Sequence, residues 1–131
     1  MVEVILLLGS NCEPENLFMD NAVDLIQKKT GKILKIGNRI ITKPYGIKEQ
    51  KDFHNQLIKI QTLLTPHELL REIKLIETEV GRSESQRWGE REIDIDIIFY
   101  DKIKMESPIL TIPHPQVYKR DFVKKMLKEF L

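Results

Sequence analysis

The sequence predicts an α+β fold, a ferredoxin-like βαββαβ sandwich whose largely antiparallel sheet carries its helices on one face, with a short C-terminal helix after it. Three observations predict it. The expected elements follow one another as strand, helix, strand, strand, helix, strand. Residues 53–63 alternate between two faces with period two, as a half-buried strand does. Thr65, Pro66 and Glu68 form a helix start with a capping box.

The first half of this pattern lies in residues 2–41. Residues 2–8 are rich in branched apolar residues and stop at a Gly-Ser-Asn turn signal, so they predict a buried strand. A helix is expected from Pro14 to Thr30, with Gly31 as its stop, because apolar residues recur there at helical spacing. Residues 33–41 predict a second strand, in which Gly37 marks a bulge.

The second half begins after a polar loop at 42–52. The strand at 53–63 leads into the capped helix, whose apolar stripe ends at Gly81. A polar loop at 82–92 precedes a strand at 93–100. Three prolines make the following tail irregular, and apolar residues from Phe122 to Phe130 predict a short closing helix.

Length and composition exclude several classes of protein. The 131 residues are expected to form a single domain over 1–131. The 21 Lys and Arg residues against 20 Asp and Glu leave a net charge of +1, which gives no general attraction for nucleic acid or an anionic membrane. The single Cys12 cannot form an intrachain disulfide, and residues 2–8 fall far short of the roughly 20 residues that span a bilayer. We expect a cytoplasmic monomer that binds neither nucleic acid nor membrane.

Asp94 and Asp96 form the most informative pattern. Side chains alternate along a strand, so these two share one face while the neighbouring isoleucines share the other. Their backbones lie roughly 7 Å apart, and two such carboxylates repel each other without a cation. Mg²⁺ commonly takes one or two carboxylates together with phosphate oxygens. For so short a motif, an acidic strand face that pairs with Lys or Arg across the sheet is the alternative.

The loop before this strand favours the metal interpretation. It contains Arg82, Arg87, Trp88 and Arg91. Guanidinium groups bind phosphate oxygens, and an indole can stack or pack on an apolar surface. The chain has no Gly-x-Gly-x-x-Gly and no P-loop motif, so side chains would have to bind the phosphates. The combination suits a nucleoside triphosphate, and an exposed charged loop is the plainer alternative.

Two further pairs of residues are candidates for ligand binding. His114, stiffened by a proline on each side, and Arg120 form a plausible second anion grip. The amide of Asn55 can both donate to and accept from the edge of a heterocycle, and Phe53 on the same strand face could stack on a flat ring. Taken alone, such residues are more often a surface-loop histidine or arginine, a core phenylalanine and a polar residue at a strand edge.

These motifs occur together and in order in a known family. They are Leu8 to Asn11 after the first strand, then Thr42, Pro44 and Gly46, then Phe53 and Asn55, then residues 87–96 (RWGEREIDID), then Ile112 to Pro115, and finally Arg120 and Phe122. Over nearly its whole length the chain resembles the 6-hydroxymethyl-7,8-dihydropterin pyrophosphokinases of folate biosynthesis.

The resemblance implies a reaction and a set of roles. ATP would donate its β- and γ-phosphates as one unit to the pterin hydroxymethyl group and leave as AMP. Asp94 and Asp96 would hold two Mg²⁺ ions and, with Arg82 and Arg91, act as catalytic residues. The implied ATP contacts are Glu77, Arg87, Trp88, Ile97, Thr111, His114 and Arg120. The implied pterin contacts are Thr42, Tyr45, Phe53, Asn55 and Phe122, the two phenylalanines enclosing the ring.

The sequence departs from the family pattern at four places. Ser83 to Ser85 form an acidic segment where members can carry another Arg, and Lys43 stands where a smaller or apolar residue is common. Ile109 replaces a phosphate-binding Arg of some members, and the chain ends soon after Phe122. These departures bear on affinity and rate more than on reaction type.

Two other functions stay open. Paired strand carboxylates would serve a two-metal nucleotidyl or phosphodiester enzyme equally well, although the Phe53, Asn55 and Phe122 set has no role there. A non-catalytic ferredoxin-like binding module is the other possibility, and it would need no Mg²⁺.

Overall fold

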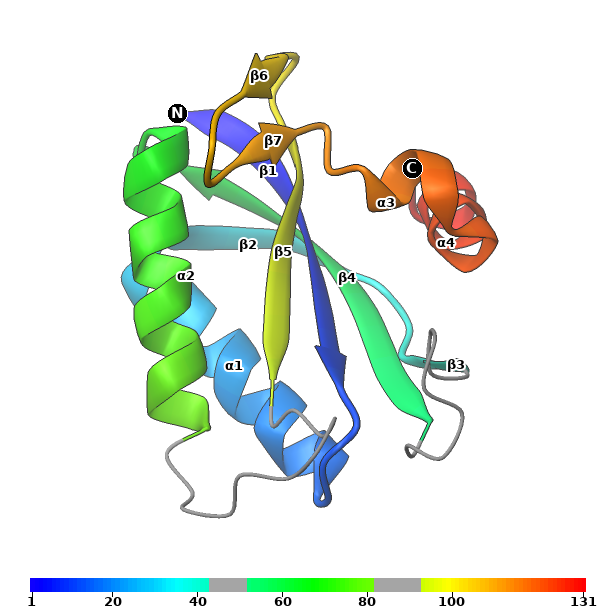
Figure 1. Cartoon of the computed structure of the whole chain (residues 1–131). Coiled ribbons are helices and arrows are strands. Elements are labelled where there is room, and N and C mark those ends of the chain that lie inside the picture. Colours follow the sequence, from blue (N-terminus) through cyan, green and yellow to red (C-terminus); the bar gives the residue numbers. More distant parts are fainter. Residues whose placement is uncertain (43–51, 82–92) are drawn as a thin grey trace.

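The computed structural model describes residues 1–42, 52–81 and 93–131 (Figure 1). The order strand, helix, strand, strand, helix, strand is confirmed, with small additions. In chain order the elements are β1 (Val2–Ser10), α1 (Glu15–Lys29), β2 (Gly31–Ile36), β3 (Ile40–Thr42), β4 (Phe53–Thr62), α2 (Pro66–Val80), β5 (Asp94–Tyr100), β6 (Met105–Glu106), β7 (Thr111–Ile112), α3 (Gln116–Lys119) and α4 (Asp121–Phe130).

The main sheet has the strand order β2-β4-β1-β5, and β3 pairs with β4 beside it. Every pairing is antiparallel, and the order is that of a ferredoxin-like sheet. The strand predicted at 33–41 is interrupted, because residues 37–39 leave the ladder between β2 and β3. At this break the N–H of Gly37 donates to the carbonyl of Leu57 at 2.8 Å. Gly37 therefore marks an interruption rather than a bulge within one continuous strand.

One face of the sheet is covered by α1 and α2, which lie together on one side of the strands in Figure 1. The apolar residues of both helices meet the inward side chains of β1, β4 and β5 in one core. The start of α2 has the predicted capping box: Thr65 Oγ1 accepts from the N–H of Glu68, and Glu68 Oε1 accepts from the N–H of Thr65 at 2.9 Å. This cap satisfies two N–H groups that a helix start leaves without partners.

The other face carries α4, on the opposite side of the sheet in Figure 1. Val123, Met126, Leu127 and Phe130 of this helix form a second core with residues of β1, β4 and β5. The closing helix predicted from Phe122 to Phe130 is thus present, and it covers part of the sheet face that the two larger helices leave open. Among the helices that the structure describes, none is long and apolar enough to cross a membrane.

Candidate active site

The register of the sheet brings the predicted site residues into one row. β1 lies between β4 and β5, and Gly9 pairs with Asn55 on one side and with Asp94 on the other. Two residues along β1, Leu7 pairs with Asp96. Because positions two apart on a strand share a face, the two carboxylates and the amide of Asn55 lie on the same side of the sheet.

These side chains surround a cavity of about 80 Å³, called here the Asn55 cavity. Its floor is Gly9, where a Cβ would lie 3.4 Å from Oδ1 of Asn55 and 3.8 Å from the Phe53 ring. Branches on such a Cβ would enter the cavity, so glycine keeps it open. The lining residues are Leu7, Gly9, Phe53, Asn55, Asp94, Asp96, Gln116 and Arg120.

A second cavity of about 320 Å³, called here the Thr111 cavity, lies between α2, β5 and the segment 107–115. It contains three of the residues predicted to contact ATP, namely Ile97, Thr111 and His114. Asp96 lines this cavity and the Asn55 cavity alike. The two cavities therefore meet at one carboxylate.

Asn55 is held in one orientation. Its Nδ2 donates to Oγ1 of Thr42 at 2.7 Å and to the carbonyl of Phe53 at 3.3 Å. A carbonyl can only accept, so the amide nitrogen must face it, and Oδ1 lies on the side of Gly9. Thr42 and Phe53 pair directly between β3 and β4, which places the three residues together. The arrangement presents an amide carbonyl at the edge of the cavity, next to an aromatic ring.

Asp96 is the most perturbed carboxyl group of the site. Burial, and then the charges of Asp94 and Glu77, raise the pKa of Asp96 to about 7. Its Oδ2 accepts from Nε2 of Gln116 at 3.0 Å. Two neighbouring carboxylates in one cavity repel each other unless a cation lies between them, so their chemistry fits a hard divalent cation such as Mg²⁺.

The protein ligands for such a cation are few. Within residues 1–42, 52–81 and 93–131, no group of three or more His, Cys, Asp or Glu side chains is arranged to hold a metal ion. Mg²⁺ normally keeps several waters and takes only one or two carboxylates beside substrate phosphates. The pair Asp94 and Asp96 matches that pattern, with the remaining ligands to come from phosphate and water.

His114 has a defined tautomer. Its Nδ1 accepts from the backbone N–H of Gln116 at 3.1 Å, so in the neutral ring the proton is on Nε2. Nε2 lies 3.7 Å from Oδ1 of Asp96. Burial lowers the pKa of His114, against a smaller opposing effect of Asp94. The neutral ring therefore presents one N–H donor where the two cavities meet.

Glu77, predicted to contact ATP, has a partner within the protein. Its Oε2 accepts from the backbone N–H of Ile95 at 2.7 Å, and its Oε1 lies 3.3 Å from Nζ of Lys74. The pKa of Glu77 is raised above its ordinary value, and burial of the carboxyl group is the largest cause. Ile95 separates the two aspartates in the sequence, so Glu77 holds the part of β5 that carries both carboxylates.

Arg120 and Phe122 lie together. The guanidinium of Arg120 is 4.3 Å above the centre of the Phe122 ring, a cation–π contact. Arg120 lines the Asn55 cavity, the one that also contains Phe53. The predicted ATP contact and the predicted pterin contact are thus neighbours, on the side of Asp96 that faces the Asn55 cavity.

Five predicted residues lie outside the described residues: Tyr45, Arg82, Arg87, Trp88 and Arg91. Conversely, the structure adds residues that the sequence analysis missed. Gln116 lines the Asn55 cavity and bonds Asp96, Leu7 lines the same cavity, and Lys74 lines the Thr111 cavity. The only sequence signal for Gln116 is its place between His114 and Arg120, two residues already singled out.

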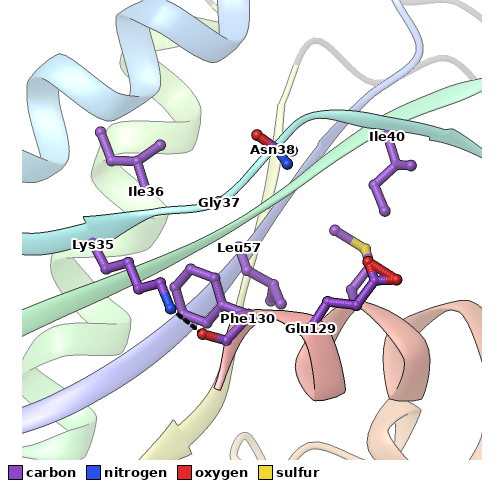
Figure 2. A pocket seen from close by; sticks show the side chains of 9 residues that line it. Lys35, Ile36, Gly37, Asn38, Ile40, Leu57, Glu129 and Phe130 are labelled. Carbon is purple, nitrogen blue, oxygen red and sulfur yellow. Dashed lines mark hydrogen bonds between the residues drawn. The ribbon is translucent and has the colours of Figure 1, made fainter.

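A further cavity of about 200 Å³ lies between the segment 35–40 and α4 (Figure 2). In it Lys35 lies 4.7 Å above the Phe130 ring and also donates to the carbonyl of Phe130. Gly37 is close to this ring, since a Cβ there would come within 3.0 Å of Phe130. None of the predicted site residues lines this cavity, so it is separate from the other two.

Known proteins are similar to this chain over most of its length. Residues 5–131 match the family described as 7,8-dihydro-6-hydroxymethylpterin-pyrophosphokinase (HPPK). The chain is 40% identical over 122 residues to the 2-amino-4-hydroxy-6-hydroxymethyldihydropteridine pyrophosphokinase of Aquifex aeolicus, which covers 93% of the chain and 76% of that protein. It is 38% identical over 129 residues to the mitochondrial folate synthesis bifunctional protein of Pisum sativum, covering 98% of the chain and 25% of that protein.

The chain thus spans about a quarter of the pea protein and about three quarters of the Aquifex protein. Among solved structures, that of wild-type Plasmodium falciparum HPPK-DHPS with SDX-DHP superposes with a TM-score of 0.73. The identity there is 18%, over 98% of this chain and 39% of that one, so this likeness concerns the fold. On the match over residues 5–131 and the identity to the Aquifex protein, the chain belongs to the 7,8-dihydro-6-hydroxymethylpterin-pyrophosphokinase family.

Proposed function

We propose that the chain transfers the pyrophosphoryl group of ATP to 6-hydroxymethyl-7,8-dihydropterin in folate biosynthesis, giving AMP and the pterin diphosphate. Family membership and the names of the relatives support this activity. The structural observation that carries it is the position of Asp96, which lines two cavities at once. A group transfer between two substrates needs their reacting atoms to meet at one point. Asp96, where the two cavities adjoin, is the proposed meeting point.

The Asn55 cavity is the proposed pterin site. Phe53 supplies a ring face for stacking, and the oriented amide of Asn55 supplies a hydrogen bond to the pterin edge. Thr42 acts through Asn55, and Phe122 acts beside Arg120. Tyr45 is proposed from the sequence alone.

The Thr111 cavity is the proposed ATP site. Ile97 and Thr111 offer an apolar surface and a hydroxyl group for the nucleoside. His114 lies on the side where the phosphates would reach Asp96, and its Nε2–H can donate to a phosphate oxygen. The sequence adds Arg82, Arg87, Trp88 and Arg91 as proposed phosphate and nucleotide contacts, with Arg120 reaching from the pterin side.

Asp94 and Asp96 are proposed to hold two Mg²⁺ ions. When bound, Mg²⁺ neutralises phosphate charge and lowers the pKa of a bound hydroxyl group, which activates it for attack on phosphorus. Neighbouring residues position the two carboxylates: Glu77 fixes the strand at Ile95, and Gly9 leaves room beside both of them. The pterin hydroxyl oxygen would form a bond to the β-phosphorus as the bond from that phosphorus to the oxygen bridging the α- and β-phosphates breaks. AMP would leave with the bridging oxygen, and the hydroxyl proton would pass to solvent.

The products of a mixed incubation test this proposal. The chain, ATP, Mg²⁺ and 6-hydroxymethyl-7,8-dihydropterin should yield AMP and pterin diphosphate in equal amounts, and omission of any component should abolish AMP. ADP as the nucleotide product would refute pyrophosphoryl transfer. Asp94→Ala and Asp96→Ala should each lose nearly all turnover. Asp24→Ala is the matched control, because Asp24 forms an exposed ion pair with Lys28 on α1.

A further inference from the structure

Gln116 lies between two charged residues of the candidate site. Its amide Nε2 donates to Oδ2 of Asp96 at 3.0 Å, and its amide Oε1 accepts from a guanidinium nitrogen of Arg120 at 3.1 Å. Its backbone N–H donates to Nδ1 of His114 at 3.1 Å. One residue thus contacts the carboxylate that lines both cavities, a guanidinium that lines the Asn55 cavity and an imidazole that lines the Thr111 cavity.

The backbone explains why these contacts can form together. Gln116 is the first residue of α3, and the N–H of Arg120 donates to the carbonyl of Gln116 at 3.1 Å. Residues four apart on a helical turn point in the same direction, so the side chains of Gln116 and Arg120 can lie side by side. The N–H of His114 donates to the carbonyl of Ile98 at 3.0 Å, which ties this segment to β5, the strand of Asp96.

We propose that Gln116 is a positioning residue for the transfer reaction, whose amide fixes the Asp96 carboxylate and the Arg120 guanidinium relative to each other. The inference rests on the proposed function. Groups that hydrogen-bond a metal-binding carboxylate set its orientation, and their loss commonly costs 10- to 100-fold in metal affinity or activity. Gln116 makes such a hydrogen bond to Asp96, and at the same time it contacts Arg120, which lines the Asn55 cavity.

The chemistry of the side chain is specific to this task. A neutral amide both donates and accepts, so it can bridge a carboxylate and a guanidinium without cancelling the charge of either. A glutamate would keep the acceptor for Arg120 and lose the donor to Asp96. A methionine has similar length and lacks both functions. These two substitutions separate the contact with Asp96 from the contact with Arg120.

Gln116→Met is the first test, made in the full chain. Mn²⁺ binding is measured by electron paramagnetic resonance in the presence of α,β-methylene-ATP, which cannot undergo the transfer. The Kd for Mn²⁺ should rise about tenfold, and kcat with ATP and Mg²⁺ should fall tenfold or more. The midpoint of thermal unfolding should shift little, because Gln116 lies in a short, partly exposed helix. Gln61→Leu, at the far end of β4 from Asn55, is the control and should match wild type.

Gln116→Glu is the second test. It keeps a partner for Arg120, so a fall in kcat similar to that of Gln116→Met assigns the effect to Asp96. If Gln116→Met and Gln116→Glu both retain kcat within twofold, or if Gln116→Met binds Mn²⁺ as wild type does, the inference is wrong. Wild-type chain that makes no AMP refutes the proposed function instead, and the Mn²⁺ measurement still reports separately on the role of Gln116.

Discussion

The Nε2 atom of His114 lies 3.7 Å from Oδ1 of Asp96, at the boundary between the Thr111 and Asn55 cavities. Because Nδ1 of His114 is occupied by a backbone N–H, Nε2 is the atom that carries the proton in the neutral ring. Burial, which lowers the pKa of His114, favours that neutral form. The ring is therefore set up to donate one hydrogen bond in the direction from which a triphosphate would approach Asp96.

Replacing His114 tests this donor. His114→Ala should raise the KM for ATP roughly tenfold, as expected for a lost hydrogen bond to a charged oxygen. His114→Gln can place an amide N–H near the position of Nε2 and should lose less. Steady-state kinetics with varied ATP provide the measurement. Equal KM values for wild type and both variants would contradict the assignment of His114 to the nucleotide.

Asp96→Asn should separate stability from activity. In the metal-free chain, the folded-state pKa of Asp96 is about 7 against an ordinary value of 3.8, so the folded state binds more protons than the unfolded state between these pH values. The stability contribution of this group is fully present below pH 4 and is lost as pH rises through 7. Asn carries no charge, so the variant should unfold with roughly 1–3 kcal/mol more free energy than wild type at pH 8.

The same variant should lose more than about a hundredfold in turnover, because it removes a charged ligand of the Mg²⁺ that would neutralise the phosphate charge. Urea unfolding at pH 5 and pH 8 in EDTA, beside an AMP assay, checks both parts. The gain in stability should shrink at pH 5. A variant less stable than wild type at pH 8 would show that the ionised carboxylate does not strain the fold.

Thr42→Val tests the orientation of Asn55. The hydroxyl of Thr42 accepts a 2.7 Å hydrogen bond from Nδ2 of Asn55, and valine removes it with little change in volume. The KM for the pterin should rise by about three- to tenfold, the effect of one hydrogen bond, while the KM for ATP stays the same. Thr78→Val on α2 is the control, since the hydroxyl of Thr78 donates to the carbonyl of Lys74 within the same exposed helix face. A change confined to the ATP KM would argue against a pterin in the Asn55 cavity.

Gly9→Val tests the cavity itself. The Cβ would lie 3.4 Å from Oδ1 of Asn55. The two methyl groups of valine would then fill much of the Asn55 cavity, whose volume is about 80 Å³. Pterin binding should weaken more than tenfold by calorimetry, while binding of α,β-methylene-ATP changes little. Wild-type affinity for the pterin would place that substrate elsewhere. Gly9→Ala should fall between wild type and Gly9→Val.

Much of the fold could be predicted because its signals are local. The capping box at Thr65 and the alternation along β4 are read directly from neighbouring residues, and both are present. The break after β2 was harder to predict, because the packing of Gly37 against Phe130, distant in sequence, accompanies it. The position of α4 over the second face is equally a matter of long-range packing.

The candidate site likewise combines features that local sequence patterns predict with contacts that depend on long-range packing. The shared face of Asp94 and Asp96 follows from strand alternation, and the sheet register places Asn55 beside them. The bond from Gln116 to Asp96 could not be predicted, because it depends on how the segment after β7 returns to β5. Glu77 shows the converse: the resemblance implies that it contacts ATP, whereas in the structure its carboxylate accepts a hydrogen bond from the backbone N–H of Ile95.

A crystal structure of the chain with Mg²⁺, α,β-methylene-ATP and 6-hydroxymethyl-7,8-dihydropterin tests the central claim most directly. The account predicts the pterin against Phe53 and Asn55, the nucleoside against Thr111, and Mg²⁺ bound to both Asp94 and Asp96 between the two substrates. Metal ions that contact neither carboxylate, or a nucleotide seated in the cavity beside Phe130, would contradict it.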